Sequence, residues 1–183
     1  MNIKFAVLAA IASGAIFAGV CQAKDYHWTF DKSNTLSPYP RSGKSQLKLV
    51  PDAAVGANAL SMENIVGKSM TVYSFLETPE QAGTIKISLH QKMVAENPAD
   101  AKFNFTFYFN KKNGKQSSAG PKLVKVVEGA KEWKLETFEI PVPAAAGTVQ
   151  MLISVSGKAA KTLFIDDLKT KFTPAAAAAP AGK

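Results

Sequence analysis

The chain has 183 residues, of which 46% are hydrophobic and 20% are charged, and its formal net charge is +8. This composition is that of a globular protein with enough residues for one domain and a substantial core. Arg41 is the only arginine and the lysines are spread along the chain. Nucleic-acid binding favours clustered arginine and lysine, so we expect a solvated basic surface and no nucleic-acid partner.

Residues 1–23 have the pattern of a secretory signal. Lys4 precedes an apolar stretch over residues 5–20, and a small-residue cleavage site ends at Ala23. Cleavage there removes Cys21, the only cysteine, so the mature chain would have no disulfide and no catalytic thiol. A lipoprotein signal with Cys21 as the lipid anchor is the alternative. We expect a secreted or periplasmic protein with no membrane attachment after cleavage.

Short apolar segments alternate with turn residues from residue 24 onwards. The strands expected in chain order cover residues 26–30, 46–50, 59–62, 69–77, 84–93, 103–110, 122–127, 133–140, 148–156 and 162–172. No segment has the periodicity of an amphipathic helix. Strands with one apolar and one polar face predict an all-β fold, a two-sheet antiparallel β-sandwich over residues 24–172. The Ala/Pro-rich residues 173–183 are expected to form a disordered tail.

Two segments carry the clearest alternation of apolar and polar residues. Residues 103–110 place four phenylalanines on one face and Asn104, Thr106, Tyr108 and Asn110 on the other. Residues 84–93 place Ile85, Ile87 and Leu89 on one face and Lys86, Ser88, His90 and Lys92 on the other. If the two strands are neighbours in a sheet, their polar faces form one surface.

The last expected strand carries two adjacent acids, Asp166 and Asp167, and the first expected strand ends at Asp31. Carboxylates set among apolar residues cost free energy unless a cation or hydrogen-bond donors meet them. Regular alternation places Asp167 on the apolar face of Leu163 and Ile165, opposite Asp166.

Four short motifs follow one another in a characteristic order along the chain. They are Phe30-Asp31, Gly-x-x-Ala-Leu from Gly56, Trp-x-x-x-x-Phe-x-Ile-Pro from Trp133, and Phe-Ile-Asp-Asp-Leu from Phe164. This order resembles the galactose-binding-like β-jelly-roll carbohydrate-binding modules of bacterial secreted proteins, over about residues 26–172. The resemblance implies a jelly roll with a structural calcium ion where the first and last strands meet. It implies Asp31 and Asp166 as calcium ligands with backbone carbonyls of a nearby loop, and Asp167 as a weaker third candidate.

The resemblance also implies a sugar site, either on the polar face of one sheet or in loops at one rim. Sugar rings stack on aromatic side chains, and their hydroxyls bind amide, imidazole and acidic groups. The expected ligand-binding residues are Tyr108, Asn104, Asn110 and His90 on the two polar strand faces, and Tyr39 in a loop.

Other aromatic residues are expected in the core. Trp28 shares a strand face with Phe30, and Trp133 opens a strand at a position that resembles the structural tryptophan of the modules. Tyr73 could add an aromatic ring to the sugar site from a third strand, although Phe75 on the same face indicates the core.

Enzyme motifs are weak in this sequence. Residues 41–45 resemble the end of a phosphate-binding loop, but Pro38 stands where the loop requires glycine. There is no zinc-protease or nucleophile-elbow motif, and nothing pairs two carboxylates for glycoside hydrolysis. We expect a non-catalytic, monomeric carbohydrate-binding module. The alternatives are an exported structural or interaction protein with the same fold, and a small polysaccharide-active enzyme such as a lyase.

Overall fold

The computed structural model describes residues 24–33, 36–39, 47–64 and 66–176. The strands are β1 (Tyr26–Trp28), β2 (Ser37–Pro38), β3 (Leu47–Val50), β4 (Ala59–Asn64), β5 (Met70–Glu77), β6 (Gly83–Ala95), β7 (Lys102–Asn110), β8 (Leu123–Glu128), β9 (Lys134–Val142), β10 (Thr148–Val155) and β11 (Lys161–Pro174). A 3-10 turn, Pro98–Asp100, lies between β6 and β7. None of the described residues form a helix with the length and hydropathy of a membrane span. The predicted signal and residues 177–183 of the predicted tail lie outside the described residues.

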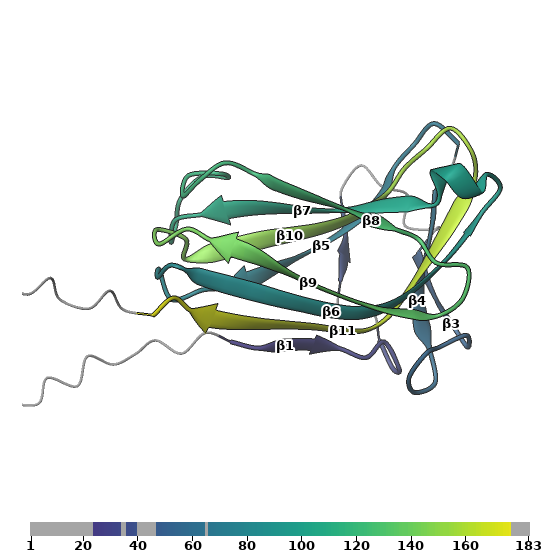
Figure 1. The fold of residues 1–183 in the computed structure, drawn as a ribbon, viewed down its shortest axis with the longest axis horizontal. Helices are drawn as coiled ribbons and strands as arrows, with labels where there is room; N and C mark the ends of the chain where they lie inside the picture. Colours follow the sequence, from purple (N-terminus) through teal and green to yellow (C-terminus); the bar gives the residue numbers. More distant parts are fainter. Residues whose placement is uncertain (1–23, 34–35, 40–46, 65, 177–183) are drawn as a thin grey trace, which may run out of the picture.

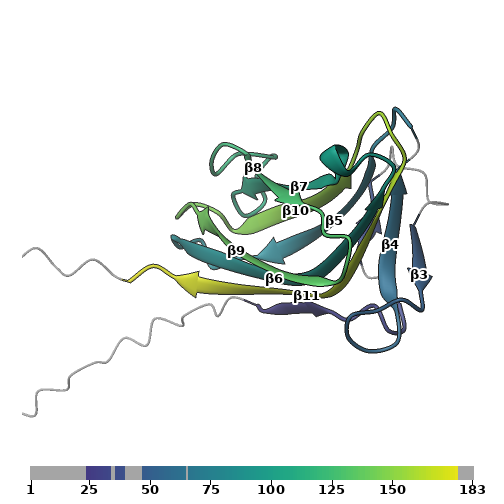
Figure 2. The ribbon, with the colours of Figure 1, turned by 45° about the vertical axis from the view of Figure 1, so that its right-hand side comes forward.

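The strands form two antiparallel sheets packed face to face, as Figures 1 and 2 show. Sheet A has the order β3-β4-β11-β6-β9, and β1 also pairs with β11. Sheet B has the order β2-β5-β10-β7-β8. The predicted two-sheet antiparallel β-sandwich is confirmed. We call the outer surfaces of the two sheets the A face and the B face.

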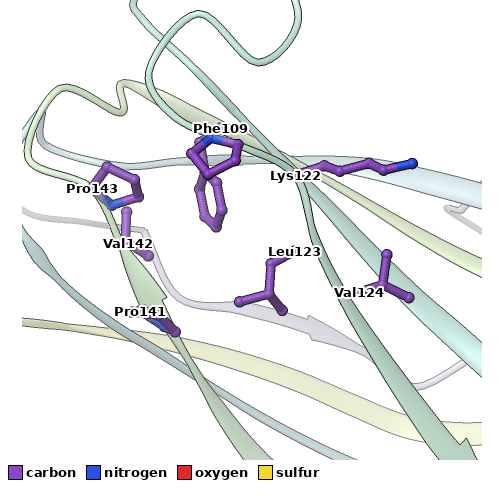
Figure 3. Close-up of a pocket in the computed structure, with 8 residues that line it drawn as sticks. Phe109, Lys122, Leu123, Val124, Pro141, Val142 and Pro143 are labelled. Carbon is purple, nitrogen blue, oxygen red and sulfur yellow. The ribbon is translucent and has the colours of Figure 1, made fainter.

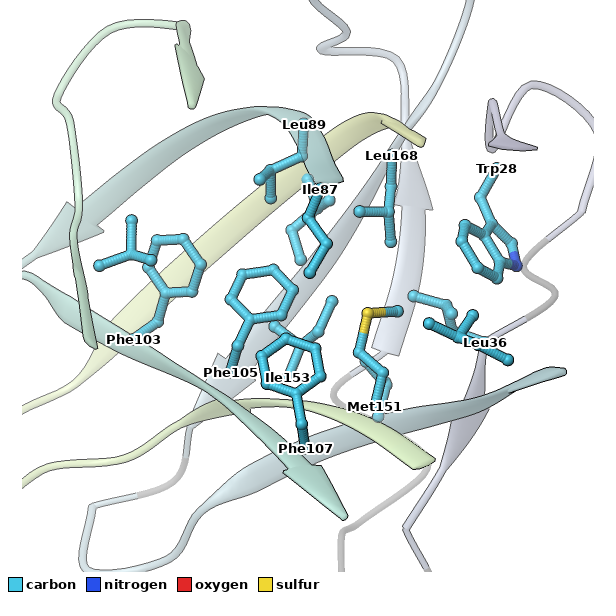
Figure 4. Packing of buried hydrophobic residues seen from close by; sticks show 14 of the residues in the cluster. Trp28, Leu36, Ile87, Leu89, Phe103, Phe105, Phe107, Met151, Ile153 and Leu168 are labelled. Carbon is cyan, nitrogen blue, oxygen red and sulfur yellow. The ribbon is translucent and has the colours of Figure 1, made fainter. Parts of the chain in front are cut away.

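The core lies between the two sheets and is rich in phenylalanine. Phe103, Phe105 and Phe107 of β7 are each at most 1% exposed, as their alternation predicts. They point toward side chains of sheet A such as Leu89 (Figure 4). Trp28 of β1 is 7% exposed and belongs to the same core, as expected. Burial of one such side chain stabilises the fold by about 1.5–3 kcal/mol.

Strands β6 and β7 follow one another in the sequence but belong to different sheets. The chain crosses between the sheets through the 3-10 turn, where Asn97 Oδ1 accepts a hydrogen bond from the backbone of Ala99 at 3.1 Å. The expectation that their polar faces form one surface is therefore wrong. His90 lies on the A face and Tyr108 on the B face, because alternation tells which side chains point inward but not which sheet a strand joins.

Strand β11 is the longest strand and organises sheet A. It pairs with β6 along its whole length. On its other side it pairs first with β4, through Lys161–Ile165, and then with β1, through Leu168–Thr170. The first and last strands of the domain therefore meet, as the resemblance to the carbohydrate-binding modules implies.

A β-bulge interrupts β11 between Asp166 and Lys169. Asp167 within it has a left-handed backbone with φ of 48°. Ile165 before the bulge and Leu168 after it are both fully buried in the core, so the alternation changes phase there. The expectation that Asp167 shares the core face is wrong, since its carboxylate meets side chains on the A face.

Candidate functional site

The B face combines aromatic rings with neutral hydrogen-bonding groups. Its side chains come from alternate positions of four strands and from the segment after β2: Tyr39, then Thr71, Tyr73 and Phe75 of β5, Gln150, Leu152 and Ser154 of β10, Asn104, Thr106 and Tyr108 of β7, and Val124 and Val126 of β8. Their opposite neighbours along each strand fill the core, which fixes the direction of this set toward solvent.

Three aromatic rings line one side of the B face. The ring of Tyr73 lies 6.1 Å from that of Tyr39 and 5.7 Å from that of Phe75, with near-perpendicular ring planes in both pairs. Phe75 is 50% exposed, whereas Val72 and Leu76 provide the core side of β5. The indication that Phe75 and Tyr73 face the core is wrong. Both faces of β5 are rich in apolar residues, so the sequence pattern does not distinguish them.

The side chains of Gln150, Leu152 and Ser154 lie in the middle of the B face, on the central strand β10. Gln150 of β10 is directly opposite Phe75 on one side and Tyr108 on the other. Its Oε1 accepts a hydrogen bond from Gln116 Nε2 at 3.2 Å, which brings the loop between β7 and β8 against this surface. The same loop is fixed by Ser117, whose backbone N–H donates to Asn110 Oδ1 at 2.9 Å.

The structure brings four of the five predicted sugar-binding residues to sheet B: Tyr108, Asn104, Asn110 and Tyr39. His90 is on the opposite side of the sandwich. The sequence reading did not single out Gln150, which lies at the centre of the face. Its signal was present, because the polar residues Thr148, Gln150 and Ser154 all fall at alternate positions of a strand that is otherwise apolar.

His90 belongs to a cluster around Asp167 on the A face. Asp167 Oδ1 lies 2.6 Å from His27 Nε2, and Asp167 Oδ2 lies 2.7 Å from Lys169 Nζ and 3.9 Å from His90 Nδ1. Partial burial raises the pKa of Asp167, but hydrogen bonds from Lys169 and His27 outweigh it and bring that pKa below its ordinary value. Asp167 therefore already has a cationic partner in Lys169 and a further hydrogen-bond partner in His27.

Asp31 and Asp166, the other two predicted metal ligands, both accept hydrogen bonds from the loop that follows β3. Asp31 Oδ1 accepts a hydrogen bond from the backbone N–H of Ala57 at 2.6 Å, and Asp166 Oδ2 accepts one from Val55 at 2.7 Å. Gly56 between them has φ of 77°, and a Cβ atom there would lie 2.3 Å from Asp31 Oδ1. Glycine is therefore required both by the backbone conformation and by the close approach of the carboxylate.

These two carboxylates suit a hard cation. Asp166 is fully buried, and neither it nor Asp31 forms an ion pair with a cation in the described part of the chain. No three His, Cys, Asp or Glu side chains of the described residues form a metal-holding group. An ion held by Asp31 and Asp166 would thus need backbone carbonyls and water as further ligands, an all-oxygen shell that calcium accepts.

Trp133 is half-buried on the A face, and its expected place in the core is wrong. Its Nε1–H donates to Asp52 Oδ1 at 3.1 Å, and its ring lies 6.5 Å from that of Phe164. Lys92 Nζ lies 2.6 Å from Asp52 Oδ2 and 5.4 Å from the Phe164 ring centroid. Hydrogen bonds from Lys92 and Trp133 lower the pKa of Asp52. This cluster holds the loop that follows β3 against sheet A.

An apolar groove of about 500 Å³ lies between the edge strands β8 and β9 (Figure 3). Its lining residues are Phe109, Pro121, Lys122, Leu123, Val124, Pro141, Val142 and Pro143. Lys122 is the only lining residue with a polar side chain. A sugar requires several polar groups to orient its hydroxyls, so the B face suits a sugar better than this groove does.

The two antiparallel sheets, with the first and last strands paired, define a β-sandwich of the jelly-roll class. Among solved structures, the chain matches the xylan-binding domain CBM22-1 of Xyn10C from Paenibacillus barcinonensis with a TM-score of 0.58 and 16% identity, over 85% of this chain and 98% of that one. It matches the C-terminal family 22 carbohydrate-binding module of Xyn10B from Clostridium thermocellum with a TM-score of 0.52 and 15% identity, over 79% and 91% of the two chains.

A third match is the enzymatically active domain of tailspike protein 4 from bacteriophage CBA120, with a TM-score of 0.54 and 10% identity over 86% of this chain. The chain spans only 20% of that protein's length. No family model and no curated protein matches the sequence. The resemblance to carbohydrate-binding modules is thus confirmed at the level of the fold, at low sequence identity.

Proposed function

We propose that this protein is an exported, monomeric and non-catalytic carbohydrate-binding module that binds a polysaccharide or oligosaccharide on the B face. The observation that carries the proposal is the set of partly exposed aromatic rings, Tyr39, Tyr73, Phe75 and Tyr108, together with the amide of Gln150, which lies between Phe75 and Tyr108. The apolar C–H face of a pyranose ring stacks on such rings, while its hydroxyls bind amides and hydroxyls.

The fold of the xylan-binding domain supports the proposal by analogy, and it makes xylan one of the first ligands to test. Affinity electrophoresis in gels that contain soluble polysaccharides is the direct experiment. We expect retardation by at least one polysaccharide, and roughly tenfold weaker binding by Tyr108→Ala, which corresponds to about 1.4 kcal/mol. Leu135→Ala is the matched control, because Leu135 is a 55% exposed apolar residue on the A face.

The apolar groove favours a second candidate, an exported interaction protein without sugar specificity. A groove of this volume with one charged lining residue is a suitable contact surface for an apolar partner. The two candidates differ in the electrophoresis experiment. Folded protein that no polysaccharide retards would reject the sugar-binding proposal and favour the interaction protein.

We also propose that a calcium ion binds where β1 meets β11, with Asp31 and Asp166 and backbone carbonyls of residues 51–58 as ligands. The buried charge of Asp166 without a cationic partner supports this site. Calcium bound there would neutralise the two carboxylates and tie the loop to both strands, which is a role in stability. Asp167 is left out, because it already forms an ion pair with Lys169. The two oxygens of Asp166, in contrast, accept hydrogen bonds from neutral backbone N–H groups, those of Val55 and Asp167.

A further inference from the structure

Strand β8 is an open edge of sheet B. It pairs with β7 on one side, and no strand of the described residues pairs with its other side. The N–H of Gly129 donates to the C=O of Ala101 at 2.6 Å, which continues the ladder of β7 and β8 by one residue pair. Because backbone groups of an antiparallel strand point to its two sides alternately, the odd-numbered residues of β8 face β7. The N–H and C=O groups of Val124 and Val126 therefore point away from the sheet.

The side chains on this edge are apolar. Val124 is 51% exposed and Val126 is 52% exposed, and both lie on the B face. Leu123 and Val124 also line the apolar groove between β8 and β9 (Figure 3). An added strand would satisfy the outward backbone groups with hydrogen bonds, while the valines and the groove contact its side chains. Exposed valines on an open edge are thus the features that strand addition requires.

Charge indicates the kind of strand that fits. Lys122 and Lys125 are exposed and form no ion pair among the described residues, whereas Glu128 is already paired with Lys102 at 3.1 Å. Two copies of this protein that paired through the two valines would place their Lys125 side chains opposite each other, which is unfavourable. A strand with carboxylates opposite the two lysines is favoured instead.

We infer that β8 binds an extended segment of another protein as an added antiparallel strand of sheet B. Apolar side chains of that segment lie opposite Val124 and Val126, and one more enters the groove beside Leu123. Its carboxylates lie opposite Lys122 and Lys125. This interaction surface goes beyond the proposed function and does not depend on sugar binding, and it would connect a bound polysaccharide to a second protein.

A synthetic peptide with the complementary pattern is the probe. As the antiparallel partner of residues 122–128, the peptide Lys-Thr-Val-Glu-Val-Leu-Glu places its valines opposite Val126 and Val124 and its glutamates opposite Lys125 and Lys122. Titration followed by NMR should give saturable binding with a dissociation constant of about 0.1–1 mM. The chemical shifts should change at β8 and at the groove. Binding that shifts only residues elsewhere, or no binding, would overturn the inference.

Hydrogen exchange distinguishes strand addition from other contacts. In the free protein the amides of Val124 and Val126 should exchange fast and those of Leu123 and Val127 slowly, because only the second pair faces β7. Saturating peptide should slow the first pair by roughly tenfold or more. Slow exchange of Val124 and Val126 in the free protein would overturn the inference. The edge would then already be covered, by a second copy if dilution restores fast exchange and by another segment of this chain if it does not.

Methylated peptides test the backbone hydrogen bonds without a change of side chain. N-methylation of both valines of the peptide should abolish binding, because their N–H groups face β8. N-methylation of the central glutamate, whose N–H faces away, should change the affinity by less than about threefold. Equal affinities of the two methylated peptides would overturn the inference.

Matched variants of the protein complete the test. Val124→Pro removes an outward N–H and leaves the ladder to β7 intact, so it should weaken peptide binding by about tenfold, whereas Val124→Thr should change it by less than about threefold. Lys122→Glu should invert the preference, so that a peptide ending in lysine binds better than the original. Equal binding by Val124→Pro and the wild-type protein, with both shown to be folded by urea unfolding, would overturn the inference. Retardation by polysaccharides is measured separately and tests only the proposed function.

Discussion

Asp31 and Asp166 accept hydrogen bonds from two backbone N–H groups of one loop, those of Ala57 at 2.6 Å and Val55 at 2.7 Å. The first carboxylate follows β1 and the second lies in β11, so the loop connects the two ends of the domain through acidic side chains. A buried carboxylate that receives only neutral donors keeps its negative charge uncompensated. Calcium at this point would have a measurable effect on stability.

Calcium should raise the thermal midpoint of the protein. An ion that binds only the folded state stabilises it by about 2.7 kcal/mol at one hundred times its dissociation constant. For a chain of this size that corresponds to a rise of about 5–10 °C, measured by differential scanning calorimetry in calcium and in chelator.

Asp166→Asn keeps the shape of the side chain and removes its charge, so it should abolish the response to calcium. Glu139→Gln removes an exposed carboxylate on β9 and serves as the control, with the response retained. Equal midpoints of the wild-type protein in calcium and in chelator would reject the calcium site.

Gly56→Ala should destabilise the domain more than Gly67→Ala. Both glycines have left-handed backbones, with φ of 77° and 76°, so both substitutions have a conformational cost of about 1–2 kcal/mol. A Cβ atom at Gly56 would also lie 2.3 Å from Asp31 Oδ1, whereas one at Gly67 would meet nothing within 4 Å. Urea unfolding of the two variants isolates the cost of that clash. Equal losses in the free energy of unfolding would show that the side chain of Asp31 moves away without cost.

Asp52 should stabilise the domain at neutral pH and lose this effect in acid. Hydrogen bonds from Lys92 and Trp133 lower its pKa in the folded state from the ordinary value of 3.8. Stability from a lowered carboxyl pKa is fully present above the unfolded value and is lost as the pH falls through the folded value. Its size should be below about 1 kcal/mol, because the Asp52 side chain is 46% exposed and water screens the ion pair.

Urea unfolding of the wild-type protein and of Asp52→Asn, at pH values from neutral into the acid range, measures the contribution of Asp52. The variant should be less stable near pH 7, and the two curves should converge as the pH falls below the lowered pKa of Asp52. A difference that stays constant with pH would show that the carboxylate charge contributes nothing. Glu139→Gln, whose carboxylate forms no ion pair among the described residues, gives the baseline for an exposed acid.

Side-chain direction could be predicted from the sequence wherever alternation is strict. Phe103, Phe105 and Phe107 are buried as predicted, and Tyr108 on the same strand points outward. The meeting of β1 and β11 was also expected, from the order of motifs. These features depend on local period and on chain order, both of which are written in the sequence.

Three features could not be predicted because they depend on contacts between distant segments. The sheet that each strand joins decides that His90 and Tyr108 lie on opposite sides of the sandwich. A bulge of one residue turns Asp167 to the A face, and no local residue pattern marks it. Phe75 points to solvent because sheet A packs against the opposite face of β5, and the two faces of β5 are almost equally apolar, so the sequence does not show which of them is covered.

Substitution by alanine should have opposite outcomes at Phe105 and Phe75. Phe105→Ala should lower stability, whereas Phe75→Ala should weaken sugar binding. Phe105 is fully buried, and its ring lies 6.0 Å from that of Phe107 and 5.1 Å from that of Phe138. Phe105→Ala should therefore destabilise the domain by about 3–5 kcal/mol, because it leaves a cavity between the sheets.

Phe75→Ala should change the free energy of unfolding by less than about 1 kcal/mol, because half of the side chain is already in water and no cavity forms. Urea unfolding, and affinity electrophoresis with a soluble polysaccharide that retards the wild-type protein, give both quantities on the same samples. We expect weakened binding with near-normal stability for Phe75→Ala. A loss of stability as large as that of Phe105→Ala would mean that Phe75 is a packing residue, since an exposed binding platform can be removed without disturbing the core.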